Sequence, residues 1–247
     1  MKHLNTLQAW TRRATLVGGL LAASLLPAQA LPIDLQLVVN VVQVCDNAGA
    51  NCASLGHAGN SYFEQEADKI WAQAGIDIKF VFSGTLDNSA LLNGSSGIDA
   101  ITGPMAGPGT TMYLMNQIPG VYGNAWLNAG GLAIAMFDVM AYNGGIGRLD
   151  TIAHELGHNL GLDHSGVANE LMASGGIRNV PSNMGQICPD PSAATCFDSL
   201  STSQIDVARR SKLLIDFVPE QVPEPATLAL LAVGLLAVGV SRARRQA

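Results

Sequence analysis

The chain has 247 residues, of which 48% are hydrophobic and 13% are charged, and its formal net charge is −6 at pH 7. This length allows one domain with a sizeable hydrophobic core between two shorter end segments. Six of the 13 Lys and Arg residues lie in those ends, so the central part is more acidic than the whole chain, which argues against nucleic acid as a partner.

The first 30 residues have the pattern of a secretory signal peptide. Basic residues, including Arg12 and Arg13, precede the apolar run ATLVGGLLAASLL, and a small-x-small cleavage pattern ends at Ala30. The run is short for a transmembrane helix, although that alternative stays open. The stretch TRRATLV also resembles a twin-arginine export signal. We therefore expect residues 1–30 to be removed during export and residues 31–220 to form the mature domain.

Four cysteines fall into two pairs that are close in sequence, Cys45 with Cys52 and Cys188 with Cys196. Neither pair has CxxC spacing, and the four do not form a zinc-finger pattern. In an exported protein, such close pairs predict two local disulfide bonds, each of which closes a small loop. The alternative is four reduced and buried thiols.

The first half of the central part alternates predicted strands and helices. The β-branched run IDLQLVVNVVQV from Ile33 predicts a buried strand. SYFEQEADKIWAQAG predicts an amphipathic helix, which Asn60 or Ser61 would cap and Gly75 would end. The strand IDIKFVF follows, and after it comes a long loop rich in Gly and Ser.

The second half begins with the predicted strand TMYLMNQ, and YGNAWLN and LAIAMFD flank an Ala-Gly-Gly turn as two further strands. A helix is expected from about Leu149, and a last helix over SQIDVARRSKLLIDF with Ile205, Ala208, Leu213 and Phe217 near its inner face. This order predicts an α+β, or mixed α/β, domain with a mixed sheet. An acidic exported domain is compatible with calcium, but no Asp-rich calcium loop is visible.

Three of the five histidines lie in the segment TIAHELGHNLGLDHS. His154 and His158 are four residues apart and therefore share one face of a helix. Gly161 can end that helix because glycine tolerates backbone angles that other residues resist, and the chain can then turn back and deliver His164. Three imidazoles would leave the fourth position of a tetrahedral zinc ion open, which is typical of a catalytic site.

Glu155 adjoins the first of these histidines but points about 100° away around the helix. It is better placed to hold a zinc-bound water than to bind the metal, so we interpret it as a general base that passes a proton to the leaving amine. HExxH alone is weakly specific, whereas HExxHxxGxxH, completed by Gly161 and His164, is far more specific. Histidines on the surface or in the core, without a metal, are the alternative.

This segment resembles the metzincin zinc endopeptidases. The resemblance implies one catalytic zinc ion on His154, His158 and His164, a general base at Glu155, and a twisted mixed sheet with an active-site helix. The stretch NELMASG would supply the family's Met-turn beneath the zinc through Met172. LGLDHS is similar to matrixins and HELGHNLG equally to adamalysins, so the subfamily stays open.

In metzincins, a strand at the sheet edge before this helix pairs with extended substrate. The resemblance implies that YGNAWLN has this role, with Gly123, Ala125 and Trp126 beside the peptide, although core packing explains Trp126 equally well. Residues 174–186 would form the wall of the specificity pocket. His57 is expected in a loop and not on the metal.

The C-terminal stretch VPEPATLALLAVGLLAVGVSRARRQA is similar to the PEP-CTERM sorting tails of Gram-negative bacteria. The resemblance implies that residues 221–247 form a sorting element with a short transmembrane helix, which an exosortase-type enzyme processes near the Pro-Glu-Pro. The protein would then reach the outside or the surface of the cell, where such substrates are often linked to exopolysaccharide. An ordinary tail anchor is the alternative.

These features together predict an exported or surface-sorted zinc endopeptidase with protein or peptide substrates. A second hypothesis is a non-catalytic adhesion or matrix module on a protease fold, against which the intact Glu155 argues. A third is a zinc hydrolase that acts on an amide other than a peptide.

Overall fold

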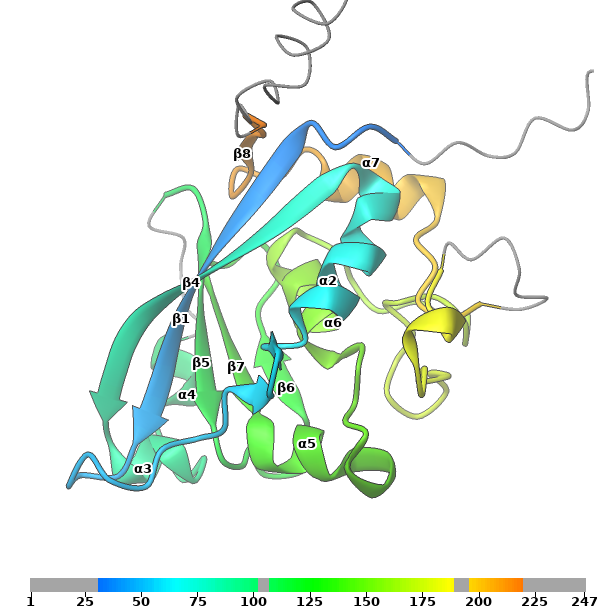
Figure 1. Ribbon diagram of the computed structural model, residues 1–247. Coiled ribbons are helices and arrows are strands. Elements are labelled where there is room, and N and C mark those ends of the chain that lie inside the picture. Colours follow the sequence, from blue (N-terminus) through cyan, green and yellow to red (C-terminus); the bar gives the residue numbers. More distant parts are fainter. Residues whose placement is uncertain (1–30, 102–106, 189–195, 220–247) are drawn as a thin grey trace, which may run out of the picture. The chain divides into compact units, whose positions relative to one another are not determined.

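The computed structural model describes residues 31–101, 107–188 and 196–219 of the chain. The main sheet has six strands and is mostly parallel (Figure 1). Five of them have the order β4-β1-β5-β7-β6, and the sixth, the short strand β8, pairs with the start of β1. Helices pack against this sheet. The mixed α/β fold class that the sequence predicts is therefore confirmed.

The elements follow one another along the chain, with η marking a 3₁₀ helix, as β1 (Leu35–Cys45), β2 (Gly56–His57), β3 (Asn60–Ser61), α2 (Glu64–Trp71), η2 (Ala72–Ala74), β4 (Ile76–Asp87), α3 (Ser89–Leu92), α4 (Ile98–Ile101), β5 (Thr110–Met115), β6 (Gly123–Ala125), β7 (Gly131–Ala135), α5 (Met136–Gly145), α6 (Thr151–Asn159), η3 (Met184–Gln186), α7 (Thr202–Ala208) and β8 (Ile215–Asp216).

The predicted signal peptide, residues 1–30, and the predicted sorting tail, residues 221–247, lie outside the described residues. Their boundaries stay predictions. Within the described ranges, no helix has the length and hydrophobicity that crossing a membrane requires, and the apolar run predicted as a membrane helix lies beyond those ranges.

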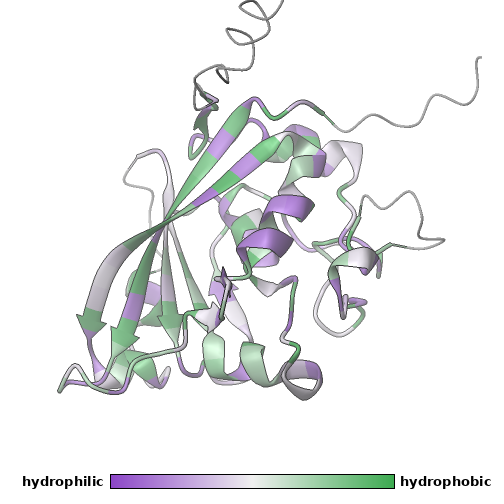
Figure 2. Ribbon diagram, viewed as in Figure 1, coloured by the Kyte–Doolittle hydropathy of each residue, from purple (hydrophilic) through white to green (hydrophobic). Residues whose placement is uncertain are grey.

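Strand β1 pairs in parallel with β4 along one edge and with β5 along the other. β5 pairs in parallel with β7, whereas β6 is antiparallel to β7 and ends the strand order. Figure 2 shows mainly hydrophobic residues along these strands, and Leu37, Val39 and Val41 of β1 are fully buried. Their alternation places one side of β1 in the core.

Helix α6, which carries the histidine motif, packs against α2 and against β6 and β7. Every residue of α6 is buried. Trp71 at the end of α2 is also fully buried, and its Nε1 donates a hydrogen bond to the Ala153 carbonyl at 3.3 Å. The motif helix is thus held between the sheet and α2.

Helix α2 begins after Phe63, whose φ is 52° and whose side chain makes no capping hydrogen bond. Neither of the predicted caps, Asn60 and Ser61, is therefore the N-cap residue, but the Asn60 Oδ1 accepts a hydrogen bond from the Gln65 N–H at 3.2 Å. It satisfies one of the amides that a first helical turn leaves free. Gly75, with a φ of 67°, ends the helical segment as predicted.

Several predictions about element boundaries are wrong. The run YGNAWLN is strand only over Gly123–Ala125, and the strand that begins with IDIKFVF continues to Asp87. The run LAIAMFD is strand only as far as Ala135, where pairing with β5 stops, and α5 begins at Met136. The predicted last helix ends at Ala208 and does not reach Phe217. Ile215 and Asp216, which were predicted as helical, form a short strand that pairs with the start of β1. The long loop after β4 contains the short helices α3 and α4.

Both predicted disulfide bonds are present, Cys45–Cys52 and Cys188–Cys196. The first closes the loop that follows β1. The second lies beside the backbone bridge between Ile187 and Phe197. Each bond closes a short loop, as the spacing of the cysteines implies.

Asp68 on α2 predicts a dependence of stability on pH. Burial raises the pKa of this half-buried carboxyl to about 7, and the negative charge of Asp77 adds to the effect. Between the ordinary value of 3.8 and about 7, the folded protein holds a proton that the unfolded chain releases, so the free energy of unfolding falls as pH rises through this window.

Asp68→Asn removes the charge but keeps an oxygen that can accept the hydrogen bond from the Ile78 N–H, now 3.3 Å long. We predict that its melting temperature relative to wild type is higher at about pH 8 than at about pH 5. Asp206→Asn, which changes an exposed residue of α7, is the control for the loss of one negative charge. If the melting temperatures of Asp68→Asn and wild type differed by the same amount at both pH values, the prediction would be wrong.

Candidate active site

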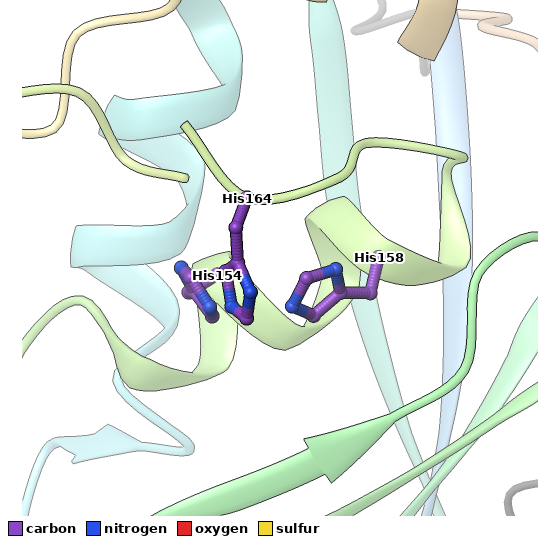
Figure 3. A group of neighbouring side chains, drawn as sticks. All are labelled: His154, His158 and His164. Carbon is purple, nitrogen blue, oxygen red and sulfur yellow. The ribbon is translucent and has the colours of Figure 1, made fainter. Parts of the chain in front are cut away.

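The three histidines of the motif meet at one place (Figure 3). His154 and His158 project from one face of α6, and His164 reaches them from the loop after the helix, so that one ligand-capable nitrogen of each lies within 4.8 Å of the others. Gly161 ends the helix with a φ of 96° and donates its N–H to the His158 carbonyl. His57 lies outside this group, as predicted, but it belongs to strand β2 and not to a loop.

In two of these rings, the Nδ1 atom forms a hydrogen bond with a backbone carbonyl oxygen. His154 Nδ1 lies 2.7 Å from the Leu171 carbonyl oxygen, and His158 Nδ1 lies 2.8 Å from that of Leu162. A protonated Nδ1 that donates to a carbonyl leaves Nε2 with its lone pair free for a metal.

The charge state of these rings also suits a metal. Burial lowers the pKa of His154 well below its ordinary value and lowers that of His158 as well, which keeps both imidazoles neutral near pH 7. Neutral imidazoles are the form that binds metal ions, and three of them are a ligand set that zinc takes. The residues present therefore fit a zinc ion.

Met172 lies fully buried beneath α6. A Cβ at Gly157 would collide with its Sδ, so the helix can lie this close only because residue 157 is glycine. The Met172 carbonyl accepts a hydrogen bond from the Ser165 N–H at 2.7 Å, next to His164 in the chain. The predicted Met-turn residue is thus in contact with the motif helix and with the loop that delivers the third histidine.

Asn159, which the sequence analysis did not single out, anchors the end of α6 to the sheet. Its Oδ1 accepts a hydrogen bond from the Thr110 hydroxyl at 2.7 Å. Its Nδ2 donates to the carbonyls of Gly131 at 3.0 Å and Trp126 at 3.3 Å. Because Asn159 is fully buried, these bonds fix the position of the helix along strands β5 to β7.

Glu155 lies against the edge strand β6. A Cβ on Gly123 would be 2.6 Å from Glu155 Cγ and 2.7 Å from its Oε1, so the absence of a side chain on Gly123 leaves room for the carboxyl group. Burial raises the pKa of Glu155 to about 8, while the positive charges of Arg178 and Arg148 oppose this rise. A carboxyl with a pKa near the working pH is suited to accept and return a proton.

The three histidines and Glu155 line one cleft of about 440 Å³ between β6 and α6. Gly123 and Ala125 form its wall on the β6 side, and Gly175 and Arg178, from the segment predicted as a pocket wall, also line it. Trp126 is 55% exposed and lies outside the lining of the cleft. Its exposure excludes core packing.

A buried charge cluster beside the cleft was not predicted. Asp150 is fully buried just before α6, with its carboxylate 3.0 Å from Arg178 Nε and 3.7 Å from Arg148 Nε. Asp198 is buried nearby, and burial together with the charge of Asp150 raises its pKa well above the ordinary value. These residues stand on both sides of the histidine motif in the chain, so no local pattern could have indicated their meeting.

A mixed α/β domain with three histidines at an open cleft has the features of a zinc metallopeptidase. Residues 26–165, more than half of the chain, match the reprolysin-like metallopeptidases of family M12B, and the chain belongs to this family. Residues 221–245 match the PEP-CTERM protein-sorting motif, which indicates an exported, surface-sorted protein of a Gram-negative bacterium. Both resemblances that the sequence suggested are confirmed at this level.

Solved structures with similarity to the chain include a chain of a chaperone–substrate complex, with 16% identity and a TM-score of 0.43 over 73% of this chain and 34% of that one. Metalloproteinase-II from Bacteroides fragilis has 14% identity and a TM-score of 0.43 over 76% and 55%. Archaemetzincin from Methanopyrus kandleri has 11% identity and a TM-score of 0.40 over 76% and 98%. The chain thus spans 34% and 55% of the first two. Among curated proteins, no sequence matches it.

The contact between Gly123 and Glu155 gives a test of the site. Gly123→Ala should displace the Glu155 carboxyl group and lower peptidase activity about 10²-fold or more, while the fold and bound zinc are retained. Gly166→Ala is the matched control, because a Cβ there meets nothing within 4 Å. Rates, zinc content and melting temperature are measured together, and full activity of Gly123→Ala would contradict the assignment of Glu155.

Proposed function

We propose that the chain is an exported zinc endopeptidase of the metzincin type, which hydrolyses peptide bonds in protein substrates. The observation that supports this most strongly is the meeting of His154, His158 and His164 beside Glu155 in one cleft. When bound there, one zinc ion would lower the pKa of a coordinated water and polarise the substrate carbonyl.

The protein's own residues have three tasks in this proposal. Glu155 takes the proton of the attacking water and passes it to the leaving amine. The free edge of β6 at Gly123 and Ala125 binds extended substrate through backbone hydrogen bonds, and exposed Trp126 lies next along the chain. Met172 acts as the Met-turn, which supports the helix from below.

The ends of the chain complete the proposal. Residues 1–30 are a signal peptide, residues 31–220 are the mature peptidase domain, and residues 221–247 are the sorting tail. An exosortase-type enzyme would process the tail, whose apolar run would hold the chain in the membrane until then. The match to the sorting motif supports this part. An association with exopolysaccharide stays a prediction.

The central test separates the proposed base from the proposed ligands. Glu155→Gln keeps the shape of the side chain but removes the base, so we predict that it binds zinc like wild type and digests casein slower by a factor on the order of 10²–10⁴. His158→Ala removes a ligand and should lose zinc as well as activity. Glu64→Gln, on the exposed start of α2, is the control.

A chelator should abolish digestion by wild type, and added zinc should restore it. If Glu155→Gln digested casein as fast as wild type, the proposed mechanism would be wrong. If zinc-loaded wild type cleaved no protein at all, the adhesion module or a hydrolase of non-peptide amides would replace the endopeptidase as the best hypothesis.

The proposed sorting tail makes a separate prediction. Mass spectrometry of protein recovered from outside the producing cells should find peptides from residues 31–219 but none that contains Arg244. The reason is that processing near the Pro-Glu-Pro removes everything after it. An intact tail on the released protein would contradict this part of the proposal and leave the peptidase itself unaffected.

A further inference from the structure

One end of the cleft carries positive charge that the proposed peptide hydrolysis does not use. Beyond Glu155, the lining of the cleft includes Arg148, Thr151 and Arg178, and we call these three residues the arginine end. Both arginine side chains are deeply buried, with exposed fractions of 9% and 4%. Two cations this far from bulk water need anionic partners.

The described residues supply these cations with one charged partner. Asp150 contacts both guanidinium groups, at 3.0 Å for Arg178 and 3.7 Å for Arg148. The Nε atoms of both arginines and the Thr151 hydroxyl oxygen have no hydrogen-bond partner among these residues, and neither do the carboxylate oxygens of Asp150 and Asp198. Asp198 is buried nearby, but among the described residues only Asp150 lies within ion-pair distance of the two guanidinium groups. Two guanidinium groups therefore share one carboxylate at ion-pair distance at this end of the cleft.

The direction of the cleft follows from contacts between β6 and α6. Tyr122, just before β6, lies under the Arg148 guanidinium, whose Cζ is 4.5 Å from the ring centroid. At the other end, the Trp126 carbonyl accepts a hydrogen bond from Asn159, the last residue of α6. Strand and helix thus run in the same direction, from the arginine end toward Trp126.

Antiparallel pairing is the more stable way to add a strand to a sheet edge. A peptide that pairs antiparallel with β6 begins near Trp126 and runs toward the arginine end. The residues after its cleaved bond, on the side of the leaving amine, therefore lie beside Arg148 and Arg178.

We propose that the arginine end binds a carboxylate of the substrate on the C-terminal side of the cleaved bond, so that the enzyme selects acidic peptides. This inference rests on the proposed peptidase function. A guanidinium group pairs with a carboxylate through two parallel hydrogen bonds, and the Thr151 hydroxyl supplies a third donor. The carboxylate comes from an Asp or Glu side chain within the first two residues after the bond, or from the C-terminus of a short peptide.

The test uses zinc-loaded wild-type protein and peptides that differ in one residue. Glu, Gln and Lys are placed in turn at each of the two positions after the cleaved bond and at the two positions before it. We expect kcat/KM for Glu to exceed that for Gln by at least about tenfold after the bond, with Lys slowest, because a neutral or positive group adds no second carboxylate for the two guanidinium groups that share Asp150. Equal rates for Glu and Gln, or a preference confined to positions before the bond, would overturn the proposal.

A second arm identifies the source of the carboxylate. Peptides that end two residues after the bond are compared as free acids and as amides. Faster cleavage of the acid assigns the arginine end to a C-terminal carboxylate, whereas a preference for internal Glu with no effect of the amide assigns it to a side chain. No effect in either arm would contradict the inference.

Variants assign the effect to residues. Arg148→Gln should reduce the ratio of the Glu and Gln rates toward one, whereas Arg210→Gln, an exposed arginine after α7, should leave the ratio unchanged. If Arg148→Gln kept the wild-type ratio of the Glu and Gln rates, the assigned site would be wrong. If this variant does not fold, the ratio measured for wild type still tests the proposal. If wild type cleaves no peptide, the proposed function fails and this inference with it, whereas cleavage without acidic preference defeats the inference alone.

Discussion

The candidate site depends on how closely the segment Leu171–Met172 packs beneath helix α6. The contact between Gly157 and Met172 leaves no space for a Cβ, so the height of the helix above this segment is fixed. The same segment offers the Leu171 carbonyl to His154 and the Met172 carbonyl to the Ser165 N–H. The Leu171 carbonyl thus orients the ring of the proposed ligand His154, and the Met172 carbonyl fixes the backbone just after His164. Hydrogen bonds to the second nitrogen of an imidazole hold the ring in place for a metal.

Charge in the cleft follows from burial. The carboxyl groups of Glu155 and Asp198 have raised pKa values because they lie away from water, and Arg148 and Arg178 limit these rises. A zinc ion would add positive charge to this environment. Fixed positive charge in a poorly solvated cleft stabilises the negative charge that develops on a substrate oxygen during hydrolysis. The same charge, at the far end of the cleft, is what we propose to select a substrate carboxylate.

Much of the site could be predicted because its information is local. The four-residue spacing of His154 and His158 and the glycine at position 161 define a helix that ends and turns back, whatever surrounds it. The charge pair of Asp150 and Arg178 could not be predicted, since only the folded chain brings these residues together. Strand β7 was predicted too long for a related reason: an apolar run fits a strand or a buried helix equally, and the point where pairing with β5 stops decides between them.

The most direct test of the proposed metal centre is X-ray absorption spectroscopy at the zinc edge of protein purified with zinc present. Three histidine ligands with an open fourth position predict one zinc per chain, with three nitrogen neighbours at about 2.0–2.1 Å and one oxygen neighbour from water. Substitution of His164 should remove one nitrogen neighbour from the spectrum. A chain without zinc, or a zinc ion with sulfur neighbours or four protein ligands, would contradict the proposal that His154, His158 and His164 form a catalytic zinc site.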